Sequence, residues 1–115
     1  MRTSFVVAAI LCALTSCQNQ RSFYTWGSYE QSVRELTRPD GVPDVDAQIQ
    51  VLSQQIERTR LENGRIPPGL HAHVGFLYSL RGDFDTAQAA FESERELFPE
   101  SAAFIDGVIE RMGGK

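Results

Sequence analysis

The stretch from Pro67 to Pro99 decides the fold, and it reads PPGLHAHVGFLYSLRGDFDTAQAAFESERELFP. On each side of Gly82 apolar residues recur every three or four positions, which is typical of a helix with one buried face. The first face holds Leu70, Val74, Leu77 and Tyr78, and the second holds Phe84, Ala87, Phe91 and Phe98. Gly82 suits the left-handed turn that ends a helix, and Asp83 can accept hydrogen bonds from the free N–H groups of the next one. The stretch therefore predicts a helical hairpin.

This hairpin resembles a tetratricopeptide repeat in the order of its small, large and turn residues. The matching positions are Gly75, Tyr78, Gly82, Asp83, Ala87, Phe91 and Pro99. Gly75 and Ala87 would let the two helices approach closely. Tyr78 and Phe91 would fill the space beside that contact.

Two positions depart from the repeat. His71 stands where the repeat often has a tryptophan, and Glu94 stands where it usually has a small residue. From Glu94 we expect a looser or more exposed contact with the next element. One such hairpin cannot bury its own apolar faces, so the flanking segments must cover them.

The flanking segments also carry helical patterns. A short helix is predicted over 27–37, and a longer one follows a cap at Asp44 or Asp46 and ends near Asn63. Ser101 is expected to cap a last helix. The apolar faces of these three helices are Tyr29, Val33 and Leu36, then Val45, Ile49, Leu52 and Ile56, then Phe104, Ile105, Val108, Ile109 and Met112. The predicted fold is all-α, a tetratricopeptide-like hairpin with flanking N-terminal helices and a C-terminal capping helix.

An aromatic cluster precedes the first of these helices and consists of Phe23, Tyr24, Trp26 and Tyr29 around Gly27. Two interpretations stay open. The rings can pack onto the helices and cover one end of a small core, which needs large side chains. Alternatively, some of them lie at a membrane surface or in a partner protein, because Tyr and Trp suit half-wet sites.

The first 17 residues have the layout of an export signal. Arg2 gives a positive start, and residues 5–14 form an apolar run that is too short to span a bilayer. The alternative is a buried N-terminal helix of a soluble domain. The apolar run is followed by a segment that resembles the bacterial lipobox, namely Leu14, Thr15, Ser16 and Cys17.

The lipobox resemblance implies that Cys17 is lipidated and becomes the new N-terminus. Residues 1–16 would then be a lipoprotein signal peptide, 17–22 a lipidated N-terminus with a short tether, and 23–115 a single helical domain. Gln18 follows the cysteine where an aspartate would signal retention in the inner membrane. The resemblance therefore implies an anchor in the outer membrane, facing the periplasm.

Composition limits the other classes of function. The chain has 115 residues, a formal charge of −4 and a pI near 5.1, which argues against a nucleic-acid partner held by phosphate contacts. Both cysteines lie within the first 17 residues, so no zinc site or disulfide framework is expected.

His71 and His73, two positions apart on a helix, point in different directions and cannot share a metal ion. We expect one near the core and one in solvent.

No residue pattern for catalysis or for a cofactor is present. The sequence has no Gly-rich phosphate loop, no set of Ser, His and Asp, and no confined pair of carboxylates. The acidic run from Glu92 to Glu100 has the alternate spacing of a solvated helix face. We therefore expect a protein that is not an enzyme and that has no cofactor.

Three segments resemble a family of small bacterial lipoproteins of unknown function. They are Tyr24-Thr-Trp26-Gly27-Ser-Tyr29-Glu30, Ile66-Pro67-Pro68-Gly69-Leu70, and the run from Phe91 to Ser101. Members of that family are usually encoded beside a lipoprotein similar to the curli secretion channel CsgG. The resemblance implies a place in an envelope lipoprotein assembly, and it offers no catalytic residues.

The sequence thus favours a lipid-anchored adaptor or accessory subunit that binds other envelope proteins, a CsgG-like lipoprotein among them. Ala72, Phe76 and Ser79 would lie on the inner face of the first hairpin helix and are candidate contacts, together with Trp26 and Tyr29. The alternative is a periplasmic module that binds a small apolar or peptide ligand in a groove around Phe76. A further alternative is that another helix covers the Phe76 face.

Overall fold

The structure is a computed structural model that describes residues 23–113. The predicted signal peptide, the lipobox and Cys17 lie outside the described residues. Within them the chain is all helical and contains no strand, which confirms the predicted fold class. The elements are α2 (Tyr29–Leu36), α3 (Val45–Leu61), α4 (Leu70–Leu80), α5 (Phe84–Leu97), the 3-10 helix η2 (Pro99–Ser101) and α6 (Ala102–Gly113).

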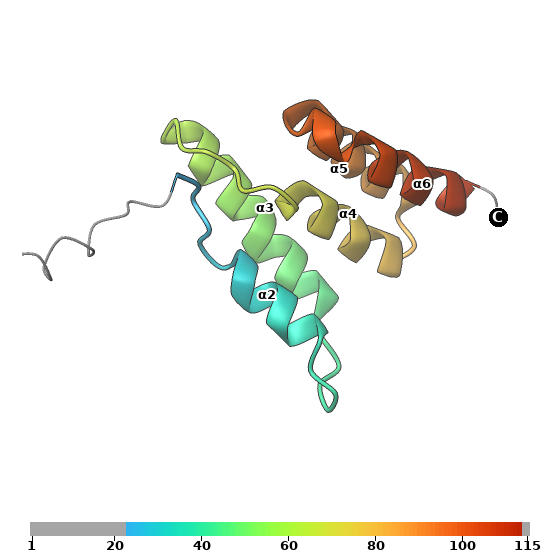
Figure 1. Ribbon diagram of the computed structural model, residues 1–115. Coiled ribbons are helices and arrows are strands. Elements are labelled where there is room, and N and C mark those ends of the chain that lie inside the picture. Colours follow the sequence, from blue (N-terminus) through green and yellow to red (C-terminus); the bar gives the residue numbers. More distant parts are fainter. Residues whose placement is uncertain (1–22, 114–115) are drawn as a thin grey trace, which may run out of the picture.

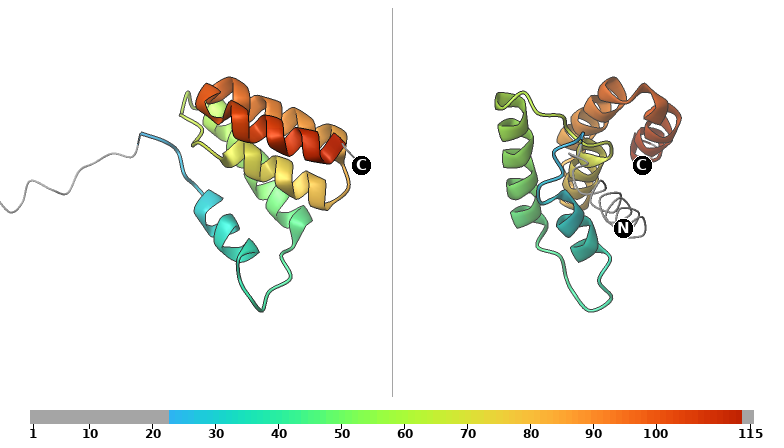
Figure 2. Two further views of the ribbon diagram at one scale, coloured as in Figure 1. Left: turned by 45° about the vertical axis from the view of Figure 1, so that its right-hand side comes forward. Right: turned by 60° about the vertical axis from the view of Figure 1, so that its left-hand side comes forward.

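The helices form a curved row. α4 packs on α3 on one side and on α5 on the other, and α6 packs on the outer side of α5 (Figure 1). Figure 2 shows the same order from two further directions, with α2 joined to α3 by the loop at the bottom of each view. None of the helices among residues 23–113 has the length and apolar character needed to cross a membrane.

Local signals set the helix ends as predicted. Asp44 caps α3, because its side chain accepts a hydrogen bond from the N–H of Ala47 at 3.0 Å. Asp83 caps α5 in the same way through the N–H of Thr86 at 3.2 Å. Gly82 has a φ of +84°, the left-handed conformation that the turn between α4 and α5 requires. These contacts confirm the helical hairpin of α4 and α5.

The core has two parts that meet at α4. The first joins α3 to α4, and the second joins α5 to α6. Their buried members are Ile49, Leu52, Ile56, Leu70, Val74 and Leu77 in the first, and Ala87, Phe91 and Ile105 in the second. These side chains belong to the predicted apolar faces. Three other predicted members, Val33, Phe84 and Phe104, are exposed instead, because nothing among residues 23–113 packs over them.

Gly75 marks the closest approach of α4 and α5. A Cβ atom built on Gly75 would lie 3.0 Å from the carbonyl oxygen of Ala87 and 3.0 Å from a ring carbon of Phe91. A larger residue could be accommodated only if the two helices moved apart. The predicted close contact between small residues is therefore present.

The expectation for Glu94 was wrong. Its side chain is only 3% exposed, and its carboxylate accepts hydrogen bonds from the backbone N–H groups of Gly69 (2.6 Å) and Ala72 (3.2 Å). These N–H groups belong to the N-terminus of α4, where Gly69 has no side chain that could cap the helix. Glu94 supplies that cap from α5, across the hairpin, and a negative charge is favourable at this end of a helix.

The prediction that Ser101 caps the last helix was also wrong. Ser101 lies in η2, and its hydroxyl donates to the carbonyl oxygen of Phe98 at 2.7 Å.

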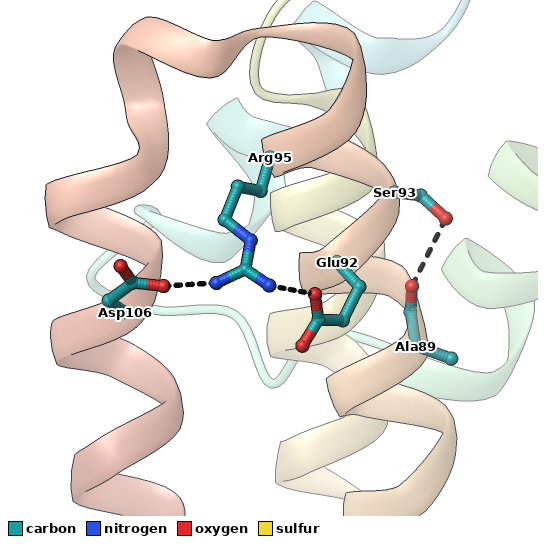
Figure 3. A network of polar contacts seen from close by, with 5 residues as sticks. All are labelled: Ala89, Glu92, Ser93, Arg95 and Asp106. Atoms are coloured by element: carbon teal, nitrogen blue, oxygen red, sulfur yellow. Dashed lines mark hydrogen bonds and ion pairs between the residues drawn. The ribbon is translucent and has the colours of Figure 1, made fainter.

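A network of charged side chains joins the last two helices, α5 and α6. The guanidinium of Arg95 on α5 donates to Glu92 on the same helix and to Asp106 on α6 (Figure 3). The hydrogen bond to Asp106 is the main reason why the pKa of Arg95 is raised above its usual value.

Candidate functional site

An apolar groove crosses α4 between α2 and α6. Its volume is about 360 Å³, and we call it the Phe76 groove. The lining residues are Tyr29 and Val33 from α2, Gly69, Ala72, His73 and Phe76 at and within α4, Phe91 from α5, and Phe104 and Val108 from α6. Four helices, α2, α4, α5 and α6, thus contribute to one surface.

Three large apolar side chains of the groove are exposed. Phe76 is 47% exposed, Phe104 is 65% exposed, and Val33 is 37% exposed. Each comes from a different helix, and all three line the same groove, so together they form one exposed apolar surface. Among residues 23–113 no other helix covers the Phe76 face. Large exposed apolar groups gathered in one place are a feature of binding surfaces.

Tyr29 forms one wall of the groove and is held in a stack of rings. The Trp26 ring lies parallel to it at 6.1 Å between centroids, and the His73 ring meets it edge-on at 5.6 Å. Gln55 fixes the segment before α2, because its amide nitrogen donates to the carbonyl of Trp26 at 2.8 Å and its oxygen accepts from the N–H of Ser28 at 2.9 Å. The position of α2 against α3 is set by these contacts.

The Tyr29 hydroxyl lies against the backbone at the start of α4. A Cβ on Gly69 would be 2.5 Å from the hydroxyl oxygen, so only glycine fits beside it, and Gly69 also has a φ of +91°. Burial raises the pKa of Tyr29, and the charge of Glu94 raises it further. Tyr29 is therefore neutral at physiological pH.

One of the two histidines, His73, is more buried than the sequence predicts. His71 is buried in the core, as expected for one of them, but His73 is only partly exposed, and Nε2 of each ring is buried without a hydrogen-bond partner. Burial lowers the pKa of both, and the positive charge of Arg60 lowers that of His71 further. Both rings are therefore neutral near pH 7. No group of three potential metal ligands occurs in the described part of the chain.

The structure brings together some of the predicted contact residues. Ala72, Phe76 and Tyr29 line the groove. Trp26 does not line it, and its ring stacks on that of Tyr29. Ser79 does not line it either, and its hydroxyl donates to the carbonyl oxygen of Phe76 at 2.7 Å.

Six groove residues are not among the predicted contacts, namely Val33, Gly69, His73, Phe91, Phe104 and Val108. Four of them belong to predicted apolar faces, and the periodicity that places a side chain on such a face does not show whether another element covers it.

A second, larger cleft lies on a different part of the surface. It has a volume of about 630 Å³ between the end of α3, the loop after it and the end of α5. Its charged lining residues are Arg60, Arg65 and Glu96, and Tyr24 and Leu97 contribute ring and apolar surface. We call it the Arg65 cleft. Charged and apolar side chains together line this cleft, whereas apolar ones dominate the Phe76 groove.

The fold and the groove define a small all-α domain with an open apolar groove on its surface. The chain belongs to the family described as "Domain of unknown function (DUF4810)", whose model matches residues 23–108. That range includes every residue that lines the Phe76 groove. No curated protein and no solved structure gives a significant match.

Proposed function

We propose that this protein is a lipid-anchored adaptor, an accessory subunit of an envelope lipoprotein assembly, that binds its partner in the Phe76 groove. The observation that carries the proposal is the exposure of Val33, Phe76 and Phe104 on three helices around one groove. A groove of this kind accepts the apolar face of a partner helix, with side chains at intervals of three or four residues filling it.

Charge adds a condition on the partner. All fifteen acidic residues of the chain lie within residues 23–113, against eight arginines there, which gives this part a formal charge of −7. Complementary charge speeds encounter and suppresses wrong partners. The partner helix therefore combines an apolar face with basic residues on its flanks.

The sequence supports the location that we propose. The lipobox resemblance at Leu14-Thr15-Ser16-Cys17 supports a lipid anchor, and Gln18 supports the outer membrane, facing the periplasm. The likeness of the α4–α5 hairpin to a tetratricopeptide repeat supports a role in protein binding. A CsgG-like lipoprotein is the first partner to test, because the resembled lipoproteins are usually encoded beside one.

The proposal includes no catalytic step. Tyr29 and His73 are the titratable side chains that line the groove, and burial favours the neutral form of each. A partner therefore meets an apolar surface with two neutral polar groups. Apolar contact accounts for the affinity in this proposal, and those two groups add direction.

Site-specific photo-crosslinking in intact cells tests the proposal. A photoreactive phenylalanine analogue replaces Phe76 in the full chain, and crosslinked proteins are identified by mass spectrometry. Phe84 is a matched control, because it is also a phenylalanine, is 48% exposed and does not line the groove. We expect one envelope protein to crosslink at position 76 and not at 84. The same proteins at both positions, or none at 76, would contradict the proposal.

A small apolar or peptide ligand is the second candidate for the groove. The observation in its favour is the volume, because about 360 Å³ falls within the range of about 300–1,000 Å³ typical of small-molecule sites. Saturable binding of the dye 1-anilinonaphthalene-8-sulfonate, lost in Phe76→Ala but kept in Phe84→Ala, would show that the groove takes such a ligand. Unchanged partner recovery with Phe76→Ala would then favour this candidate over the adaptor.

A further inference from the structure

We propose that the surface around Phe23 and Arg65 lies against the membrane and contacts the headgroups of anionic phospholipids. We call it the Phe23–Arg65 face, and it consists of Phe23, Arg60, Arg65 and Leu97. The inference rests on the lipid anchor of the proposed function and adds to it the orientation of the domain on the bilayer.

Chain length places this face next to the anchor. Phe23 follows Cys17 by six residues, so the two are separated by at most about 20 Å of extended chain. The N–H of Thr25 donates to the carbonyl of Arg65 at 2.8 Å, which fixes the start of the domain to the loop after α3 (Figure 1). The chain then passes Trp26 before Tyr29 reaches the Phe76 groove. The end of α3 is therefore held near the bilayer.

The side chains at this end suit a membrane interface. Phe23 is 61% exposed, whereas the Tyr24 ring contacts that of Phe98 at 6.3 Å between centroids. The guanidinium carbon of Arg65 lies 4.0 Å from the centre of the Phe23 ring. An exposed aromatic ring beside an arginine can enter the headgroup region while the guanidinium meets a phosphate. Leu97, half exposed at the end of α5, extends the apolar part of this face.

Each of the two interpretations of the aromatic cluster thus applies to different rings. Tyr24, Trp26 and Tyr29 pack in a row of ring contacts, whereas Phe23 stands at the outer end of that row. The packing interpretation describes the inner rings. Phe23 is the one that is free to reach the bilayer.

Charge favours the same orientation. Arg58, Arg60 and Arg65 fall within eight residues at the end of α3 and in the loop after it. Two of them line the Arg65 cleft, which has room for a phosphate headgroup. Glu62 lies between Arg60 and Arg65 in the sequence, Glu96 also lines the cleft, and Arg60 pairs with the exposed Glu57 at 3.3 Å, so the arginines are partly balanced. The rest of this acidic domain is repelled by an anionic surface, and the arginine-rich end is therefore the end that can approach it.

The orientation has a consequence for the Phe76 groove. The groove is lined by residues of α2, α4, α5 and α6, and it shares no lining residue with the Arg65 cleft. With the Phe23–Arg65 face on the bilayer, the groove stays open to a partner in the aqueous space.

Fluorescent labels on the acylated full-length protein test the orientation. The protein is purified from membranes and reconstituted in phosphatidylcholine vesicles with or without phosphatidylglycerol. An introduced cysteine is then the one free thiol, because Cys12 leaves with the signal peptide and the Cys17 sulfur carries lipid. The variants are Phe23→Cys and, as control, Val42→Cys, which lies in the loop between α2 and α3 and is 99% exposed. Each carries a polarity-sensitive dye.

In the anionic vesicles we expect the emission of the dye at position 23 to shift to the blue and to be quenched by lipid-borne quenchers. The emission of the dye at position 42 should be that of a dye in water. Removal of one arginine by Arg65→Gln or Arg60→Gln should lower the lipid-contacting fraction about five-fold in equilibrium constant. Arg38→Gln, in the same loop as Val42, should leave it unchanged.

The contradicting outcomes are distinct. Vesicle-bound protein whose dye at 23 reports water overturns the orientation and leaves the anchored adaptor intact. Protein that is not acylated and does not float with vesicles overturns both. Reversal of the shift by inorganic phosphate, but not by sodium chloride of equal ionic strength, would show that the face binds free phosphate, and the membrane assignment would be wrong.

Discussion

The carboxylate of Glu94 accepts a hydrogen bond of 2.6 Å from the backbone N–H of Gly69, on the neighbouring helix and 25 positions earlier in the chain. This contact ties the second half of the hairpin to the start of the first. It also fixes the floor of the Phe76 groove, because Gly69 and Ala72, the two residues whose N–H groups Glu94 holds, both line it.

Removal of this cap should destabilise the domain. Glu94→Ala leaves two partly buried N–H groups without an acceptor, and we expect the free energy of unfolding to fall by about 1–3 kcal/mol. Glu94→Gln keeps one acceptor oxygen and should cost less. Urea denaturation measures both. Glu96→Ala, an exposed glutamate of the same helix, is the control and should change stability by less than about 0.5 kcal/mol. Equal effects at 94 and 96 would show that the cap contributes nothing.

Two glycines inside helices should respond in opposite directions to alanine. At Gly75 the new methyl group meets backbone and ring atoms at 3.0 Å, and overpacking of this kind costs about 1–3 kcal/mol. At Gly107 the nearest atom is 3.9 Å away on the flexible Arg111 side chain. Gly107→Ala should therefore stabilise the domain by about 0.5–1 kcal/mol through helix propensity. Thermal unfolding that shifts in the same direction for both variants would contradict the close contact.

Stability should fall in mild acid because of the two histidines. Their folded pKa values lie below the usual histidine pKa of about 6.5, so the unfolded chain binds more protons as the pH falls through this value. The stability is thus complete above about pH 6.5 and decreases below it. The double variant His71→Gln with His73→Gln should have a flatter profile between about pH 7 and pH 5.5 in thermal unfolding. An unchanged slope in the double variant would show that other groups are responsible.

Cys17 carries the predicted anchor. Cys17→Ala should abolish labelling by radioactive palmitate and leave the precursor with its signal peptide, since the lipobox resemblance implies that the acyl group and the new N-terminus both form at this residue. Cys12→Ala is the matched control and should be processed and labelled normally. Labelling that persists in Cys17→Ala would place the lipid elsewhere or show that the lipobox resemblance is misleading.

Short-range features of the fold were accessible from the sequence because they depend on neighbouring residues. Asp83 caps the helix that begins at the next residue, and Gly82 takes the conformation that a tight turn demands. Glu94 was misjudged because its partners, the N–H groups of Gly69 and Ala72, lie more than twenty positions away. No local pattern shows that a helix start without a capping side chain lies beside it.

The candidate site was predictable only in part, for a related reason. Phe76 was singled out from its position on the inner face of its helix, and it does line a groove. Phe104 was assigned to a buried face because it shares the spacing of Ile105 and Val108. Burial depends on what lies opposite, and among residues 23–113 nothing covers Phe104, whereas Ile105 is fully enclosed.

The affinity of the crosslinked envelope partner for two phenylalanine variants tests the adaptor claim most directly. We expect Phe76→Ser to weaken binding by at least about ten-fold in a titration with the purified partner, since a large apolar contact at the centre of a groove is lost. Phe84→Ser, equally exposed but outside the groove, should bind as the unaltered protein does. Equal binding by all three, or equal losses in both variants, would contradict the account.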